Sequence, residues 1–417
     1  MFIDKSTSKC LQLKKCLGNF PRIYLSYMRI LFLYDFPLWG SGSGTWLRHL
    51  VEELVKMNHK VGIIAPEERR FLEDKIKQYR VNPPQIPVFV GHPELKGAKR
   101  YSELSEREIT DVYKAYLDTT IEAVANFKPD IIHVHHLFLI AWVARYIYAL
   151  QGVKYLIVSH GSDLYALLSD KRYLRLCRDA VNSARAIVAN SGWTRREFLK
   201  LFGKEHSGKV RIIPGGIDIK QYPANLDTKS VDQKYNLDGK KVVLFTGRLI
   251  SHKGVRYLVR AAKDIKGEVF IVGDGPEKQY LQTLIDRKKL QNVHLIGYLT
   301  GQDLIEFYYR ADVFVAPSVW EEPMGFTILE AMASKTPVIA TRRGGIPMLV
   351  KHGYNGLFVK VRNSKEIAAA CNKLLEDDEL RKKLGENARK TVEEKFTWKQ
   401  IAQKFIRLYK KLANRNK

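Results

Sequence analysis

The chain has 417 residues, of which 45% are hydrophobic and 27% are charged. That length allows two or three domains, and the composition excludes a disordered or fibrous protein. Lysine and arginine outnumber aspartate and glutamate by 70 to 44, which gives a formal net charge of +26. Such an excess favours anionic partners, among them nucleotides, phospholipid surfaces and nucleic acid.

The four cysteines, Cys10, Cys16, Cys177 and Cys371, show no paired metal-binding spacing. We therefore expect neither a zinc site nor a disulfide framework, and we expect a reducing, cytoplasmic compartment. No apolar stretch approaches the roughly 20 residues that a membrane span needs. Any membrane contact is then expected to be peripheral, on the inner face of the cell membrane.

Residues 1–27 are basic and lack a periodic pattern, so we interpret them as a loose extension before a domain that starts at Met28. From there, short apolar runs alternate with amphipathic stretches. The runs predict strands at 30–34, 60–65, 87–90, 130–134, 154–159, 185–190 and 210–213, and then at 241–247, 268–273, 293–297, 312–317, 337–340 and 356–359. This alternation is typical of parallel sheets with helices on both faces. It predicts an α/β protein of two doubly wound, Rossmann-like domains, 28–217 and 218–398.

Ligands of such domains bind at the carboxyl ends of the strands, so the loops there are the candidate sites. The first loop, WGSGSGT at 39–45, contains Gly42 and Gly44, which let an anion approach the backbone at a helix N-terminus. The second, GRLISHKG at 247–254, contains Arg248 and Lys253, and a guanidinium with an ammonium suits a diphosphate. Their alternative roles are a plain turn and two solvated cations.

The third loop, EEPMGFTILEAMA at 321–333, follows a predicted strand. Pro323 suits the first turn of a helix, which would leave the amides of 324–326 free to bind an anion or a sugar hydroxyl. Glu322 and Glu330 are carboxylates that can accept hydrogen bonds from sugar hydroxyls. The alternative is an acid that stabilises the helix dipole and a second, solvated one.

Together these motifs resemble the family 4 glycosyltransferases of the GT-B fold, from about Met28 to the end of the chain. The strongest match is E-x7-E, from Glu322 to Glu330, within PSVWEEPMGFTILEAMA. It is accompanied by GRLISHKG, GDGPE, GGIP and HGYNGLFV in the second half and by SGSG, PDIIHVHH, SHGSD, ANSGWT and IIPGGID in the first. Lys335, Met348 and the Ser-Gly pair at 41–42 depart from the family pattern.

The resemblance implies that the second domain binds a nucleoside diphosphate sugar and that the first, joined by a helix at about 399–417, binds the acceptor. Arg248 and Lys253 would neutralise the diphosphate, and Glu330 would bind the ribose. The transferred sugar would meet Glu322 and the backbone of Met324, Gly325 and Phe326, and His160 would reach the sugar or the β-phosphate from across the cleft. Gly42 and Gly44 would approach the phosphate or the acceptor, and the backbone of Gly297, Tyr298 and Leu299 would contact the base.

The implied reaction retains the anomeric configuration, with the leaving diphosphate helping to deprotonate the acceptor hydroxyl. The chain contains no D-x-D, which favours a metal-independent reaction with the nucleotide sugar as co-substrate and no cofactor. His133, His135 and His136 have no partner ligand at metal spacing, so a structural or cleft-lining role is expected for them.

Two other functions fit parts of the sequence: a sugar-nucleotide epimerase of the same fold, and a nucleic-acid-binding protein. The E-x7-E motif favours transfer, and the basic residues lack the aromatic motifs of RNA-binding modules, so no nucleic-acid partner is expected. The acceptor is either a sugar or a lipid-linked molecule at an anionic membrane. The membrane hypothesis depends on an amphipathic helical pattern at 69–80, on Lys96, Lys99 and Arg100, and on a basic helix at 398–412.

Overall fold

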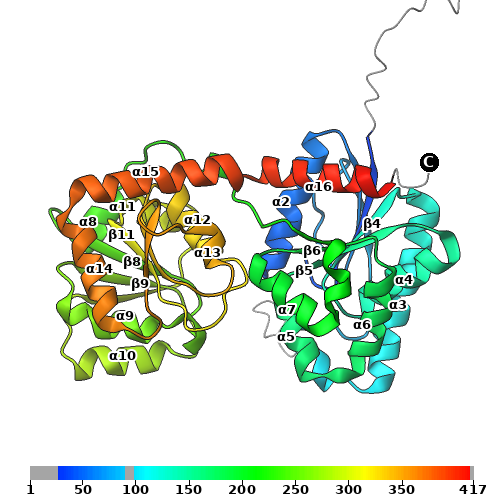
Figure 1. The fold of residues 1–417 in the computed structure, drawn as a ribbon, viewed down its shortest axis with the longest axis horizontal. Coiled ribbons are helices and arrows are strands. Elements are labelled where there is room, and N and C mark those ends of the chain that lie inside the picture. The colour runs from blue at the N-terminus through cyan, green and yellow to red at the C-terminus, as the bar shows by residue number, and fades with distance from the viewer. Residues whose placement is uncertain (1–26, 90–97, 414–417) are drawn as a thin grey trace, which may run out of the picture.

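The computed structural model describes residues 27–89 and 98–413, which form two α/β units (Figure 1). The extension expected at 1–27 lies outside the described residues except for Tyr27, and so does Lys96. Each unit is built on one sheet whose strand pairs are all parallel. Helices cover both faces of each sheet, as Figure 1 shows, so the expected doubly wound α/β fold is confirmed.

The first unit has a seven-stranded sheet in the order β3-β2-β1-β4-β5-β6-β7. Its central strands are almost wholly buried, which explains why their residues are mostly apolar. The strands are β1 (Arg29–Leu33), β2 (Lys60–Ala65), β3 (Lys77–Arg80), β4 (Ile131–His135), β5 (Tyr155–Ser159), β6 (Ala186–Ala189) and β7 (Val210–Ile212). The helices are α2 (Gly42–Lys56), α3 (Glu106–Phe127), α4 (Leu139–Gln151), α5 (Ser162–Ser169), α6 (Leu174–Ser183) and α7 (Gly192–Phe202).

The second unit has a six-stranded sheet in the order β10-β9-β8-β11-β12-β13. Its strands are β8 (Val242–Thr246), β9 (Glu268–Val272), β10 (Val293–Gly297), β11 (Val313–Ala316), β12 (Val338–Thr341) and β13 (Gly356–Val359). Its helices are α8 (Lys229–Tyr235), α9 (Val255–Ala261), α10 (Lys278–Arg287), α11 (Gly301–Arg310), α12 (Phe326–Ala333), α13 (Ile346–Leu349), α14 (Ser364–Glu376) and α15 (Asp378–Lys395). The strand order reverses between β1 and β4 in the first sheet and between β8 and β11 in the second.

Two sequence predictions near the edge of the first sheet are wrong. The third strand of the chain is β3, at Lys77–Arg80, inside the segment expected to be an amphipathic helix. Leu72 and Asp74 have positive φ angles of 49° and 64°, which interrupt any helix there. The run at 87–90, expected to be a strand, makes only an isolated bridge from Val88 to Arg100. Because β3 is an edge strand, few of its residues are apolar. The spacing of the apolar residues in this segment therefore resembled that of one face of a helix.

The last helix, α16 (Trp398–Ala413), crosses back from the second unit and packs on the first (Figure 1). Phe405 and Tyr409 are fully buried in the core of the first unit, and the rings of Trp398 and Trp46 lie 5.6 Å apart. Packing therefore accounts for the amphipathic pattern of this helix. Among the residues that the structure describes, no helix is long and apolar enough to cross a bilayer.

Candidate active site

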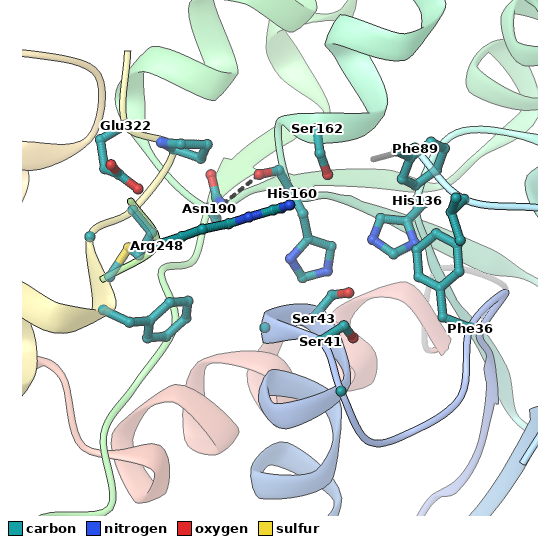
Figure 2. A pocket seen from close by; sticks show the side chains of 17 residues that line it. Phe36, Ser41, Ser43, Phe89, His136, His160, Ser162, Asn190, Arg248 and Glu322 are labelled. Carbon is teal, nitrogen blue, oxygen red and sulfur yellow. Dashed lines mark hydrogen bonds between the residues drawn. The ribbon is translucent and has the colours of Figure 1, made fainter. Parts of the chain in front are cut away.

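A cavity of about 470 Å³ lies between the two units, at the carboxyl ends of their strands (Figure 2). Its walls come mainly from the loops after β1 and β11, and the loops after β4 and β8 add His136 and Arg248. These four strands are the ones between which each sheet order reverses. Doubly wound sheets bind ligands at this point. The lining residues are Phe36, Gly40, Ser41, Gly42, Ser43, Val88, Phe89, His136, His160, Ser162, Asn190, Arg248, Glu322, Pro323, Met324, Gly325 and Phe326.

Arg248 is an unpaired cation in this cavity. It follows β8, is exposed, and has no carboxylate partner within the described chain. Figure 2 shows its side chain extending across the cavity toward the first unit. Lys253, which we predicted to act beside it, is instead paired: its Nζ lies 2.6 Å from Oε2 of Glu322. The free guanidinium is therefore the group that can meet an anion directly, while Lys253 holds the carboxylate.

Hydrogen bonds within the second unit hold the Glu322 loop. The amide of Gly345 donates to the carbonyl oxygen of Glu322 over 2.6 Å, and that of Gly344 donates to the side chain of Glu321. Glu321 also pairs with Arg343, at 2.9 Å. These contacts tie the loop after β11 to the loop after β12, so the position of Glu322 depends on both.

The helix that follows this loop begins later than predicted. Helix α12 starts at Phe326, and Gly325 caps it with a φ of 91°, so Pro323 lies outside the helix and not in its first turn. Only a residue without a Cβ adopts this φ readily. The amides of 324–326 have no acceptor within the described chain, as predicted. They form one wall of the cavity and are free to bind an anion.

The loop before α2 forms the opposite wall. Ser41 caps α2 by accepting a hydrogen bond from the amide of Gly44, at 3.0 Å, and the Tyr34 hydroxyl bonds the hydroxyls of Ser41 and Ser43. A Cβ on Gly42 would meet no atom within 4 Å, so its α-carbon faces the open cavity. Gly44 is not among the lining residues, because its amide and α-carbon face the loop: a Cβ there would lie 2.5 Å from the Leu38 carbonyl oxygen.

His160 follows β5 and lines the cavity at the end of a column of stacked imidazoles. Its ring stacks on that of His135 at 5.2 Å, and His135 stacks on His133 at 4.8 Å. Nε2 of His160 lies 3.0 Å from Nδ1 of His135. Burial lowers the pKa of both imidazoles well below the ordinary value, so both rings are neutral at physiological pH.

The turn after His160 is fixed by polar contacts. The Asp163 carboxylate accepts the amide of Gly161 at 2.8 Å and the Ser159 hydroxyl at 3.0 Å. Asn190, at the end of β6, donates to the carbonyl oxygen of His160 over 3.0 Å. Contacts from the SHGSD and ANSGWT motifs therefore help to place the imidazole in the cavity.

Two family models match the chain one after the other. Residues 40–221 match the model described as Glycosyltransferase Family 4, and residues 227–391 match the one described as Glycosyl transferases group 1. The chain belongs to the family 4 glycosyltransferases.

Known proteins of this kind align with nearly the whole chain. A glycosyltransferase of Methanocaldococcus jannaschii is 28% identical over 397 residues, which cover 89% of this chain and 94% of that protein. The structure of sucrose-phosphate synthase from Thermosynechococcus elongatus covers 92% of this chain and 98% of its own, with a TM-score of 0.74 and 22% identity. That of Anabaena HepE in complex with UDP-glucose covers 92% and 100%, with a TM-score of 0.70 and 21% identity. These likenesses confirm the GT-B fold.

The second glutamate of the E-x7-E motif lies apart from the main cavity of this glycosyltransferase. Glu330, on α12, is partly buried and accepts a hydrogen bond of 2.6 Å from the Tyr308 hydroxyl. Burial raises the pKa of its carboxyl to about 7, although the Tyr308 hydrogen bond acts in the opposite direction. It is therefore a carboxyl whose charge changes near physiological pH.

The predicted base-binding segment also lies outside the main cavity of the glycosyltransferase. Gly297, Tyr298 and Leu299 end and follow β10, which is separated from β8 by β9. The Tyr298 side chain is 75% exposed. Neighbouring strands are about 4.8 Å apart, so this segment is about two strand spacings from Arg248. A ligand reaching both would have to lie along the ends of β8, β9 and β10.

Several residues of the glycosyltransferase cavity had no sequence prediction. Ser162 and Asn190 lie in motifs that the resemblance contained, but no role followed from a serine or an asparagine alone. Phe36 and Phe89, 5.2 Å apart, form an apolar wall with His136. Phe89 had been placed in a strand. In the structure the chain bends at Phe89, directly after the Val88 bridge, and the Phe89 side chain lines the cavity.

The buried histidines of the glycosyltransferase have structural partners. His136 lies 2.7 Å from the Asp35 carboxylate; burial alone would lower the pKa of His136, but the charge of Asp35 outweighs it and the pKa is raised. His133 is hydrogen-bonded to the Tyr409 hydroxyl of α16. Within the part of the chain that is described, no three His, Cys, Asp or Glu side chains group as metal ligands do.

Proposed function

We propose that this glycosyltransferase moves a hexose-type sugar from a nucleoside diphosphate sugar to an acceptor hydroxyl. The observation that carries the proposal is the cavity itself, in which the unpaired Arg248 guanidinium and the free amides of 324–326 face His160. A cation and oriented amides around one point suit a diphosphate. The complex of the HepE neighbour with UDP-glucose supports a donor of this class.

The proposed roles combine these positions with the roles that membership of the family implies. Arg248 and the amides of 324–326 bind the diphosphate, and Glu322, held by Lys253, accepts hydrogen bonds from the sugar hydroxyls. The neutral His160 contacts the sugar or the β-phosphate from the first unit. Glu330 binds the ribose, and Gly297, Tyr298 and Leu299 approach the base. Gly42, with its open α-carbon, lets the ligand approach the backbone of α2.

We propose further that transfer retains the anomeric configuration and needs no metal ion. The acceptor oxygen forms its bond to the anomeric carbon on the face from which the diphosphate oxygen leaves, and that oxygen takes the acceptor proton. The charge on the leaving diphosphate is then neutralised by Arg248 and by the helix amides. The test is the anomeric configuration of the product by NMR, with activity measured again in excess EDTA; inversion or loss of activity would each contradict this part.

The acceptor class is proposed from the first unit. Val88, Phe36 and Phe89 give the acceptor side an apolar wall, which suits a sugar ring or the apolar part of a lipid-linked acceptor. The net charge of +26 supports an anionic membrane surface as the place of reaction. Sedimentation with anionic vesicles at low salt tests this; protein left in the supernatant would favour a soluble sugar acceptor.

The donor is tested by a screen of UDP-, GDP- and ADP-sugars for thermal stabilisation, because a ligand that binds the folded state raises its apparent stability. One base series should stabilise the wild type and fail to stabilise Arg248→Ala. No response to any series would overturn the donor assignment. The epimerase alternative is not favoured by the comparisons. It would convert the sugar of the donor without an acceptor, which the same incubations reveal.

A further inference from the structure

A second cavity, of about 340 Å³, lies in the second unit beside α13 and α15. It shares no lining residue with the cavity between the units. Its walls include Arg342 after β12, Lys351 and His352 in the loop before β13, and Lys395 at the end of α15. A volume above about 300 Å³ is typical of small-molecule sites.

The charges around this cavity have one sign. No aspartate or glutamate is among its lining residues, and Arg342, Lys351 and Lys395 form no ion pair within the described chain. Neighbouring arginines do find partners: Arg343 pairs with Glu321 and Arg389 with Glu393. Like charges gathered around one hollow repel one another, so an anion bound there would be favoured by all three.

Aromatic rings hold these cations and offer flat surfaces. The Arg342 guanidinium lies 4.4 Å from the centre of the Phe358 ring, and the Lys351 ammonium 5.4 Å from that of Tyr354. Nδ1 of His352 accepts the Phe358 amide at 2.9 Å, so a neutral His352 has its proton on Nε2 as a further donor. Fixed cations, a donor and ring faces together suit a phosphate ester with an organic part.

This cavity is physically linked to the active site. Arg342 is followed by Arg343, which pairs with Glu321, and by Gly344 and Gly345, whose amides hold the Glu321–Glu322 segment. Lys395 precedes Phe396, whose carbonyl oxygen accepts a hydrogen bond of 2.8 Å from the amide of Ile217. This bond lies where the two chain segments that connect the units meet. A ligand that contacts both Arg342 and Lys395 would therefore connect the loop that holds Glu322 to the chain segment at Phe396 that joins the two units.

We propose that this cavity is a second ligand site, which binds a small phosphorylated molecule and modulates sugar transfer through the 342–345 segment. The binding part is independent of the proposed function, and only the modulation rests on it. The chemistry required is a phosphate monoester or free phosphate. A lipid headgroup carries the same chemistry and is distinguished by the experiment.

Binding is tested by calorimetric titration of the full chain with glycerol 3-phosphate and with inorganic phosphate. The background is Arg248→Ala/Lys253→Ala, which weakens anion binding in the active site. We expect saturable binding that Arg342→Ala/Lys395→Ala weakens at least tenfold and that Lys382→Ala, an exposed lysine on the same helix α15, leaves unchanged. Equal binding in all variants, or none in the starting protein, would overturn the proposal.

A second arm separates the two sources of phosphate. Phosphatidylglycerol vesicles that sediment the protein in dependence on Arg342 and Lys395, with no binding of the soluble ester, would assign the site to a lipid surface and overturn the small-molecule proposal. For modulation, glycerol 3-phosphate should change the transfer rate at least twofold in the wild type and not in Arg342→Ala/Lys395→Ala. The same response in both would overturn the modulation. Absence of transfer with every donor would contradict the proposed function and leave the binding result standing.

Discussion

The ammonium of Lys253 lies 2.6 Å from Oε2 of Glu322, across the gap between the loops after β8 and β11. Both side chains are partly buried, at 27% and 17% exposure. Two residues that the sequence assigned to different parts of the donor thus form one ion pair at the point where the sheet order reverses. Arg248, on the same loop as Lys253, has no such partner in the described chain. Removal of Arg248 and removal of Lys253 should therefore have different effects on activity and on stability.

We predict that Arg248→Ala lowers kcat about 100-fold, because it removes the charge that stabilises the leaving diphosphate by about 3 kcal/mol. Lys253→Ala should also lower kcat, because Glu322 loses the ammonium that holds it in the cavity. Only Lys253→Ala should also lower the free energy of unfolding, by about 1 kcal/mol, since it leaves the Glu322 carboxylate without its cation. Urea denaturation beside steady-state kinetics measures both quantities. Near-normal turnover in Arg248→Ala would remove the diphosphate assignment.

We predict that Gly344→Ala abolishes most activity. Its φ is 56°, and a Cβ would lie 2.1 Å from the carbonyl oxygen of Glu322, so the loop that carries Glu322 would have to move. Gly353→Ala is the matched control: its φ is 74°, but a Cβ there meets no atom within 4 Å. The control should lose only about 1 kcal/mol of stability, the backbone cost, and keep its kcat. Equal kcat values in the two variants would show that the Glu322 loop tolerates the shift.

Lys335 offers a prediction about stability alone. It ends the turn after α12 with a φ of 60°, a conformation in which glycine is preferred, and its side chain is exposed. Lys335→Gly should therefore raise the free energy of unfolding by about 1 kcal/mol, because the left-handed conformation costs a non-glycine residue about that much. Kinetic constants should stay the same. A lower unfolding midpoint in urea would contradict the argument.

The sequence predicted the sheets well where strands are buried on both faces, because β1, β4 and β5 consist mostly of apolar residues. It failed at β3, an edge strand, where Ile76 and Tyr79 matched a helical spacing equally well. For the site, three residues that the sequence analysis named in the loops after β5, β8 and β11 line the cavity, namely His160, Arg248 and Glu322. The Lys253–Glu322 pair and the Phe89 wall could not be foreseen, since both depend on how separate loops meet.

The contact between His135 and His160 suggests a positioning residue. The Nε2 atom of His135 is buried without a partner in the described structure, while its Nδ1 faces Nε2 of His160. A proton on Nδ1 of His135 satisfies this contact, and His160 then has its own proton on Nδ1. His135→Phe keeps a stacked ring but removes the hydrogen bond. It should lower kcat roughly tenfold, which corresponds to a loss of about 1.4 kcal/mol of transition-state stabilisation. KM should change little.

His133→Phe is the control for that experiment, since His133 stacks on His135 but bonds Tyr409 and not His160. Its kcat should stay near that of the wild type. A fall of equal size in both variants would mean that the column acts through packing alone, and a rise in KM without a change in kcat would contradict a role in orienting His160 for the reaction.

Glu330 and Glu322 should differ in how they bind the donor. If Glu330 accepts the ribose hydroxyls, Glu330→Gln weakens binding of the bare nucleoside diphosphate, and Glu322→Gln spares it while lowering transfer. The carboxyl of Glu330 has a pKa of about 7 because it is buried. Below that pH it is protonated and a poorer acceptor, and above it the carboxylate makes charge-assisted hydrogen bonds. Donor affinity should therefore rise about tenfold between pH 6 and pH 8 if only the ionised form binds well.

The measurement uses the intact nucleotide sugar, whose diphosphate stays fully ionised over this range, so that the change reports the protein. Glu322→Gln should keep the pH dependence, and Glu330→Gln should abolish it. The sign of the stability change follows from the same shift. Because the folded state binds the Glu330 proton more tightly than the unfolded state does, this carboxyl's contribution to stability is lost as pH rises through about 7. Glu330→Gln should thus be more stable relative to wild type at pH 8 than at pH 5, and an unchanged difference between the two pH values would show that the carboxyl is ionised throughout.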